Sequence, residues 1–223
     1  MRKKNIDVLI NNELFYEDIF YNTNFYSRLK DDIKKDKKLL IHLLPRIWSW
    51  EDEDSLTEIK KIVKSNFGSD INFFKSVLQN EYEDGSCLIL AQDNILDNKE
   101  ILLLAVSAAK KHDRLGTTIN VFAPNSLKRN QKFLAEVLEI YPKEFEFLGN
   151  YVSNKNIVLS VVKIDGNLLK YVIDKFKNDI DVIKTAMKSN LSAVQYVPSI
   201  LKSKPESPFF IEWYEFKDGN IKL

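Results

Sequence analysis

The chain has 223 residues, 44% of them hydrophobic, and its 33 Lys and Arg against 32 Asp and Glu leave a net charge of +1. Such a chain can bury a full core without disulfides or metals, and its balanced charge excludes a global field that attracts nucleic acid or an acidic membrane surface. Only five of the cations are Arg, the side chain whose planar fork suits phosphate and base edges. We therefore do not expect nucleic-acid binding.

The cysteine count and the apolar runs predict the cellular location. Cys87 is the only cysteine, so no internal disulfide can form, which favours a reducing compartment. The sequence has no N-terminal apolar signal segment and no apolar run of about 18 residues, so we expect a cytoplasmic protein without membrane contact. The heavy use of Lys, Asn and Ile, with only six Gly, is typical of an AT-rich genome and indicates a bacterial source.

The predicted fold class is mainly α, with stacked helix-turn-helix repeats in an α-solenoid-like arrangement and a C-terminal β-hairpin. In chain order, we expect an N-terminal helical cap rich in Tyr and Phe at 1–29, six imperfect helical repeats at 30–202, and the hairpin as a C-terminal cap at 203–223. Terminal repeats of such proteins are usually covered, which is why a cap is expected at each end.

The repeats are recognised by a short pattern that recurs along 30–202. In each copy, apolar residues lie three positions before an Asp or Asn and three, four, seven and eight positions after it. An Asp or Asn side chain accepts hydrogen bonds from the free N–H groups of a helix's first turn, so it marks an N-cap, and the apolar positions make one helical face. The predicted N-caps are Asp36, Asp70, Asn98, Asn130, Asn154 and Asp179.

A second, shorter helix is predicted after the first one in each repeat. Asp165-Gly166, Asn190 and Pro142 follow about a dozen residues after their caps, where a helix stop is expected. Each repeat is therefore predicted to be a helix-turn-helix of about 24 residues, which is stable only when stacked on its neighbours. The matching positions of the second helix are Phe145, Phe147 and Leu148, then Leu169, Tyr171 and Val172, then Val194, Tyr196 and Val197.

Two insertions interrupt the N-terminal repeats. PRIWSWEDEDSL (45–56) places Trp48 and Trp50 directly before acidic residues that include Glu51 and Asp52. Exposed tryptophans beside acidic residues would anchor a basic protein partner; alternatively the two rings are buried and the acids precede a helix that starts near Ser55. The second insertion, KKHDRLGTTINVFAPNS (110–126), is predicted to be a loop because Gly and Pro punctuate it.

The C-terminal repeats carry a family resemblance. The phrase NKNIVLSVVKIDGNLLKYV (154–172), followed by NDIDVIKTAMKSNLSAVQYV (178–197), resembles the bacterial repeat family catalogued as domain of unknown function 4116. The resemblance is good over 127–201 and fainter over 33–126, and the repeat is also similar in length and opening Asp to leucine-rich-variant helical repeats. It implies a right-handed stack of helix pairs and no particular chemistry, so it implies no catalytic residue.

The C-terminal segment SPFFIEWYEFKDGNIKL (207–223) is rich in aromatic and β-branched residues, with a Lys-Asp-Gly-Asn turn that predicts a β-hairpin. Trp213 is expected either to pack on the last repeat or, with Tyr214, to line an open edge that accepts a partner strand.

No catalytic motif is present. Cys87 with His112 could in principle make a thiolate pair, but the setting GSCLILA is typical of a small buried side chain, and His42 lies in the apolar run LLIHLLP. No spacing for a metal site or phosphate loop is found. We expect no enzyme activity and no cofactor.

Three functions therefore remain open. The favoured one is a protein-protein interaction scaffold with one protein partner, which could be a bacterial inhibitor, immunity or effector protein. Its predicted contact residues are Trp48, Trp50, Glu51, Asp52, Trp213 and Tyr214. The alternatives are a nucleic-acid-binding helical repeat protein, which would need a sorted stripe of Lys, and an enzyme that depends on Cys87.

Overall fold

The computed structural model describes residues 6, 26, 29–49, 53–116 and 118–203. Within this range the chain separates into two compact units, and the boundary lies between Pro124 and Asn125. We call the parts before and after this boundary the N-terminal unit and the C-terminal unit. The predicted terminal caps at 1–29 and 203–223 lie almost entirely outside the described residues.

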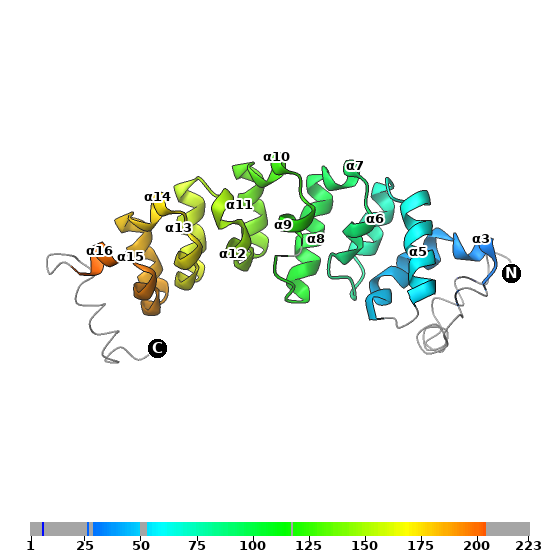
Figure 1. Ribbon diagram of the computed structural model, residues 1–223, viewed down its shortest axis with the longest axis horizontal. Helices are drawn as coiled ribbons and strands as arrows, with labels where there is room; N and C mark the ends of the chain where they lie inside the picture. The colour runs from blue at the N-terminus through cyan, green and yellow to red at the C-terminus, as the bar shows by residue number, and fades with distance from the viewer. Residues whose placement is uncertain (1–5, 7–25, 27–28, 50–52, 117, 204–223) are drawn as a thin grey trace. The chain divides into compact units, whose positions relative to one another are not determined.

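The N-terminal unit is built from helices of very different lengths (Figure 1). Buried apolar side chains of α5, α6 and α8 make half of its core. The elements are α3 (Asp31–Lys34), α4 (Lys37–Leu43), η3 (Leu44–Ser49), α5 (Glu53–Asn66), α6 (Ile71–Leu78), η4 (Ser86–Leu90), α7 (Asp93–Leu96), α8 (Lys99–Lys111) and α9 (Ile119–Phe122), where η marks a 3-10 helix.

The C-terminal unit is more regular. Its helices α11, α13 and α15 each have ten residues and lie side by side, with the short helices α10 and α14 at the upper edge in Figure 1. The elements are α10 (Asn125–Lys128), α11 (Gln131–Ile140), η5 (Pro142–Glu144), α12 (Phe145–Leu148), η6 (Gly149–Tyr151), α13 (Lys155–Ile164), η7 (Gly166–Tyr171), α14 (Asp174–Lys177), α15 (Ile180–Ser189), η8 (Leu191–Tyr196) and α16 (Ser199–Lys202).

The predicted N-caps are confirmed at all six positions. Each of these residues has an extended backbone, directly precedes the first residue of a helix and accepts a hydrogen bond from a backbone N–H of the first turn. This bond satisfies a donor that the helix itself leaves free, which typically stabilises a helix by about 1 kcal/mol. The helices that begin in this way are α4 after Asp36, α6 after Asp70, α8 after Asn98, α11 after Asn130, α13 after Asn154 and α15 after Asp179.

The predicted apolar face is also confirmed. In α13 the buried residues are Ile157, Val158, Val161 and Val162, at the third, fourth, seventh and eighth positions after the cap. The helix α15 buries the same four positions, and α13 packs directly against α15. Because fully burying one aliphatic side chain stabilises a fold by about 1.5–3 kcal/mol, this stripe on each helix is the main force that holds adjacent repeats together.

A second, shorter helix follows the first in each of the C-terminal repeats, and its type varies. It contains the α-helix α12 in the first of them, whereas η7 and η8 are six-residue 3-10 helices that directly follow α13 and α15. The side chains of Asp165 and Asn190 accept hydrogen bonds from the N–H groups of Asn167 and Ser192, at 2.9 and 3.0 Å, and thereby start these segments. Such short segments are typical of 3-10 geometry, in which residues three apart share a face.

Two further predictions are wrong. The described residues contain no β-strand, so the fold class is corrected to an all-helical architecture and the C-terminal β-hairpin is withdrawn; residues 207–223 themselves lie outside the described range. Strand propensity expresses packing in a sheet, and an isolated two-stranded hairpin is only marginally stable. The insertion at 110–126 is not wholly a loop either, because it contains α9. Among the described helices, none combines the length and apolar character needed to cross a membrane.

Candidate functional site

A row of aromatic side chains lies on the second, shorter helices of the C-terminal repeats. Phe147, Tyr171 and Tyr196 occupy equivalent positions of three successive repeats, in α12, η7 and η8. The segment η7 packs against both α12 and η8, so the three positions are neighbours in space. Phe147 is 41% exposed and the two tyrosines are partly exposed. We call these three residues the aromatic row.

The local geometry explains why the row faces outward. In and directly after η7, Leu168, Leu169 and Val172 are buried while Lys170 is exposed and Tyr171 is partly exposed. Because a 3-10 helix has three residues per turn, Leu169 and Val172 share the face turned to the core. Tyr171 lies at the edge of this buried face and is partly open to solvent.

A pocket of about 360 Å³ lies beside Tyr171. The Tyr171 hydroxyl donates a hydrogen bond of 2.9 Å to Glu146 Oε2, which links two successive repeats, and this bond raises the pKa of Tyr171. The Nζ of Lys170 lies 5.2 Å from the centre of the Tyr171 ring. The pocket is lined by Glu146, Asn150, Lys170, Tyr171, Val172, Ile173, Asp174 and Lys177.

The charges around this pocket are mixed in sign. Glu146 and Asp174 supply two carboxylates, and Lys170 and Lys177 supply two cations. Only a loose contact of 3.9 Å joins Lys177 Nζ to Asp174 Oδ1. A uniformly anionic backbone would meet repulsion at the two carboxylates, whereas a protein surface can match both signs. The arrangement can thus bind polar and charged side chains while the aromatic row supplies apolar contact area.

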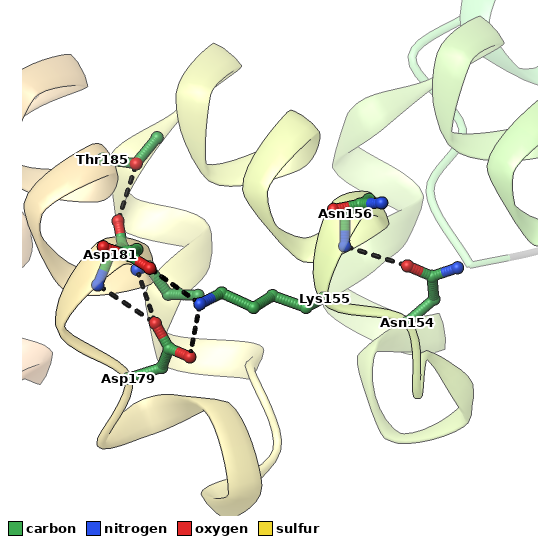
Figure 2. A network of polar contacts seen from close by, with 7 residues as sticks. Asn154, Lys155, Asn156, Asp179, Asp181 and Thr185 are labelled. Carbon is green, nitrogen blue, oxygen red and sulfur yellow. Dashed lines mark hydrogen bonds and ion pairs between the residues drawn. The ribbon is translucent and has the colours of Figure 1, made fainter.

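A lysine at the start of one repeat helix contacts the N-cap of the next repeat (Figure 2). The Nζ of Lys155, the first residue of α13, lies 2.8 Å from Asp179 Oδ2 and 2.8 Å from Asp181 Oδ2 of the next repeat. The hydrogen bond with Asp179 is the main cause that raises the pKa of Lys155, and the same bond lowers the pKa of Asp179. An N-cap thus serves its own helix and also ties that helix to the preceding one.

The same arrangement occurs in the N-terminal unit, where Lys37 Nζ lies 2.6 Å from Asp70 Oδ2. Burial works to raise the pKa of Asp70, but the hydrogen bonds from Lys37 and from the N–H of Phe73 outweigh it and lower the pKa. The sequence analysis missed this pairing. A signal was present, because both Asp caps after the first one, Asp70 and Asp179, are preceded one repeat earlier by a Lys directly after the cap.

Most of the predicted contact residues lie outside the described range. Only the backbone of Trp48 is described, as part of η3. The other predicted contacts lie outside the described residues and stay predictions; they are Trp50, Glu51, Asp52, Trp213 and Tyr214.

The residues weighed for catalysis are engaged elsewhere. Cys87 is fully buried, and burial raises its pKa, so the side chain stays a thiol. His112 is exposed and places Nε2 3.0 Å from the carbonyl oxygen of Glu81. His42 places Nδ1 2.8 Å from the Lys38 carbonyl within its own helix. Over the described part of the chain, no group of three or more His, Cys, Asp or Glu side chains is arranged to hold a metal ion.

Comparison with known proteins gives one match. Residues 154–202 match the family model described as a domain of unknown function, DUF4116, which confirms the resemblance seen in the sequence over this segment. No curated protein and no solved structure matches the chain. The matched segment spans α13 to α16 and includes Tyr171 and Tyr196 of the aromatic row.

Proposed function

We propose that this chain, which carries a DUF4116 segment at 154–202, is a protein-protein interaction scaffold. In this proposal the C-terminal unit binds one protein partner along the aromatic row. The observation that carries the proposal is the combination of three aligned, partly exposed aromatic rings with an adjacent pocket of mixed charge.

Aromatic side chains at this exposure favour a protein partner. Tyr and Phe are enriched at protein-protein interfaces, and aromatic residues account for a large share of binding energy. In the aromatic row they recur once per repeat, so they form an extended contact surface of the kind that repeat proteins use. The Tyr171–Glu146 hydrogen bond keeps one ring in place before the partner arrives, which reduces the entropy lost on binding.

The charge pattern favours a protein over a nucleic acid. The residues directly before the rings of the aromatic row are Glu146, Lys170 and Gln195, which are acidic, basic and neutral in turn. A nucleic-acid site requires a positive stripe along the phosphate path, and this row does not supply one. The nucleic-acid alternative is therefore the less favoured of the two binding functions.

The proposal keeps the sequence-based contact residues as a second contact region. Trp48, Trp50, Glu51 and Asp52 would contact the partner from the N-terminal unit, and the segment with Trp213 and Tyr214 from the C-terminal end. The composition supports a bacterial, cytoplasmic protein. The proposed roles for such a scaffold are those of an inhibitor, immunity or effector protein. In this proposal, the helical repeats within each unit stack on one another as an α-solenoid.

A capture experiment with matched variants tests the proposal. The tagged protein is incubated with host lysate, with and without nuclease, and bound proteins are quantified by mass spectrometry. The row variant combines Phe147→Ala with Tyr171→Ala; the control combines Ile164→Ala with Ile180→Ala, which removes apolar side chains that are 62% and 49% exposed in the same unit.

The wild type and the control are expected to retain one protein near a one-to-one ratio, with or without nuclease. The row variant is expected to retain at least roughly tenfold less of this protein, because a hot-spot aromatic typically contributes about 2 kcal/mol or more. Circular dichroism checks that both variants are folded. Equal capture by the row variant, or capture of nuclease-sensitive material alone, would overturn the proposal.

A further inference from the structure

A carboxyl group is completely buried in the N-terminal unit. Glu83 lies between α6 and η4, in the segment that runs from Gln79 to Leu90, and it is 0% exposed. Its Oε1 accepts hydrogen bonds of 3.0 Å from the N–H groups of Gly85 and Cys87, while its Oε2 has no hydrogen-bond partner. We call residues 79–90 the Glu83 segment.

A second unsatisfied polar atom lies against the same segment. Thr118 is 1% exposed and its Oγ1 has no hydrogen-bond partner. This oxygen lies beside Gly85, because a Cβ placed on Gly85 would come within 3.3 Å of it and within 3.2 Å of the Ala105 carbonyl oxygen. Gly85 also has φ of 93°, which favours glycine. The closed segment therefore buries two polar atoms that have no hydrogen-bond partner, Glu83 Oε2 and Thr118 Oγ1, and it packs tightly around Gly85.

The charged groups around Glu83 do not neutralise it. The charge of Asp84 acts against a second negative charge on Glu83, and the titratable thiol of Cys87 contacts Glu83 as a neutral group. Asp84 is itself paired with Arg114 at 3.0 Å. The segment η4 packs against α5 and α6, and Gly85 packs against α8 at Ala105. The buried residues of α5, α6 and α8 are apolar except for one serine. From the end of α8, His112 contacts the Glu81 carbonyl rather than the buried carboxyl.

Ionisation of Glu83 thus opposes the closed arrangement. Burial raises the pKa of Glu83 to about 7 from an ordinary value of 4.5, and the charge of Asp84 adds to this, although the N–H groups of Cys87 and Gly85 act in the opposite direction. An acid whose pKa is raised on closure stabilises the closed state fully below pH 4.5. That contribution is lost progressively as the pH rises to about 7, and is constant above it.

We propose that the Glu83 segment is a pH-sensitive latch, which is closed most firmly when Glu83 is protonated and opens more readily as the pH rises through neutrality. Opening would bring Glu83 into water and expose Cys87, which is fully buried in the closed state. The segment also carries Tyr82 and Ile89, which are 51% and 58% exposed. Opening of the segment would therefore also move two apolar side chains that lie at the surface. Tyr82 lies under Arg46, whose guanidinium carbon is 4.2 Å from the ring centre.

The only cysteine of the chain provides the test. The rate at which iodoacetamide labels Cys87 is measured at intervals from pH 6 to pH 8 for the wild type and for Glu83→Gln, whose side chain resembles the protonated carboxyl. In the closed segment burial and Glu83 raise the pKa of Cys87, and the buried thiol is out of reach of the reagent, so labelling takes place in the open segment. There the intrinsic rise in thiolate with pH is common to both proteins, and the ratio of their rates reports the change in opening. With the two pKa values above, this ratio is expected to rise roughly tenfold over the interval.

The control variant is Glu81→Gln, which removes an exposed carboxylate two residues away and should keep the wild-type pH dependence. A wild-type to Glu83→Gln ratio that stays flat overturns the latch. Should Glu83→Gln fail to fold, hydrogen exchange of the wild type decides. Corrected for intrinsic rates, protection of residues 79–90 should fall from pH 6 to pH 8 while that of α13 stays constant, and equal behaviour of both segments would contradict the proposal.

Discussion

The two units are built from the same repeat pattern, but the pattern is regular in one unit and irregular in the other. In both, helices begin at an Asp or Asn cap and bury the apolar stripe that follows. In the C-terminal unit the caps recur every 24 or 25 residues, and a 3-10 segment follows each helix closely; in the N-terminal unit the spacing is irregular and extra elements such as α5 intervene. A cap acts locally and survives insertions, whereas the second half of a repeat depends on its neighbours.

The difference in repeat spacing also gives the two units different features, an aligned aromatic row in one and a buried carboxyl group in the other. Regular spacing in the C-terminal unit aligns Phe147, Tyr171 and Tyr196 on successive repeats, and an aligned row is what a binding surface requires. In the N-terminal unit the longer connection between α6 and η4 folds back and buries Glu83. The longer connection between α6 and η4 thus holds a buried titratable group in one unit, while even spacing aligns the three aromatic residues in the other.

The largest expected effect concerns the close packing of the regular unit. A Cβ on Gly166 would lie 2.1 Å from the carbonyl oxygen of Ala186, a backbone atom that cannot easily move. We expect Gly166→Ala to lower the free energy of unfolding by about 1–3 kcal/mol, as overpacking does. Urea denaturation measures this, with exposed Lys163→Ala as control. A Gly166→Ala protein as stable as the control would show that the repeats are not packed this closely.

The second prediction asks whether the irregular unit shares in binding. Trp48→Ala combined with Trp50→Ala is expected to leave the fold intact and to weaken partner capture roughly tenfold, or by about 1.4 kcal/mol. Capture and circular dichroism are measured on the same preparations. If the double variant unfolds, the two rings belong to the core, and the contact surface lies in the C-terminal unit alone.

The third prediction compares the caps of the two units directly. Asp70→Ala and Asp179→Ala each remove an N-cap and its contact with a lysine of the preceding repeat. We expect each to lower the free energy of unfolding by about 1 kcal/mol, measured by urea denaturation against Asp181→Ala, which does not cap a helix. Unchanged stability in both cap variants would contradict the repeat register.

The smallest expected effect is the acid dependence of the Lys155–Asp179 ion pair. The pKa of Asp179 is lowered mainly by Lys155, so this carboxylate stabilises the fold above its ordinary pKa near 4, and the stabilisation is lost as the pH falls through the lowered value. Lys155→Gln should raise the pKa of Asp179 and shrink this loss, as measured by denaturation at pH 7 and pH 3. An unchanged acid dependence would show that the ion pair is not formed in solution.

The sequence was sufficient to predict what is local. An Asp or Asn followed by apolar residues at fixed positions identified all six caps because cap and helix lie within one turn of each other. It was not sufficient to distinguish a 3-10 segment from an α-helix over six residues such as 166–171, since the apolar positions fit both. The β-hairpin predicted at 207–223 is withdrawn because the described residues contain no strand for it to join, and 207–223 lie outside the described range.

The candidate sites were harder to predict because they depend on contacts between distant residues. The aromatic row could be aligned from the repeats, but its exposure and the Tyr171–Glu146 bond required the structure. The stretch EYEDGS (81–86) resembles an exposed acidic turn, yet Glu83 is buried because the backbone N–H groups of Gly85 and Cys87 converge on it. A sequence pattern cannot show which of several acids is turned inward.

Hydrogen exchange of the chain alone and in complex with its captured partner is the most direct test of the central claim. The account predicts that protection increases on binding at 142–151, 166–171 and 191–196, the segments around the aromatic row, while the buried faces of α13 and α15 remain unchanged. Protection confined to the N-terminal unit, with none at these three segments, would contradict the claim that the regular C-terminal repeats form the binding surface.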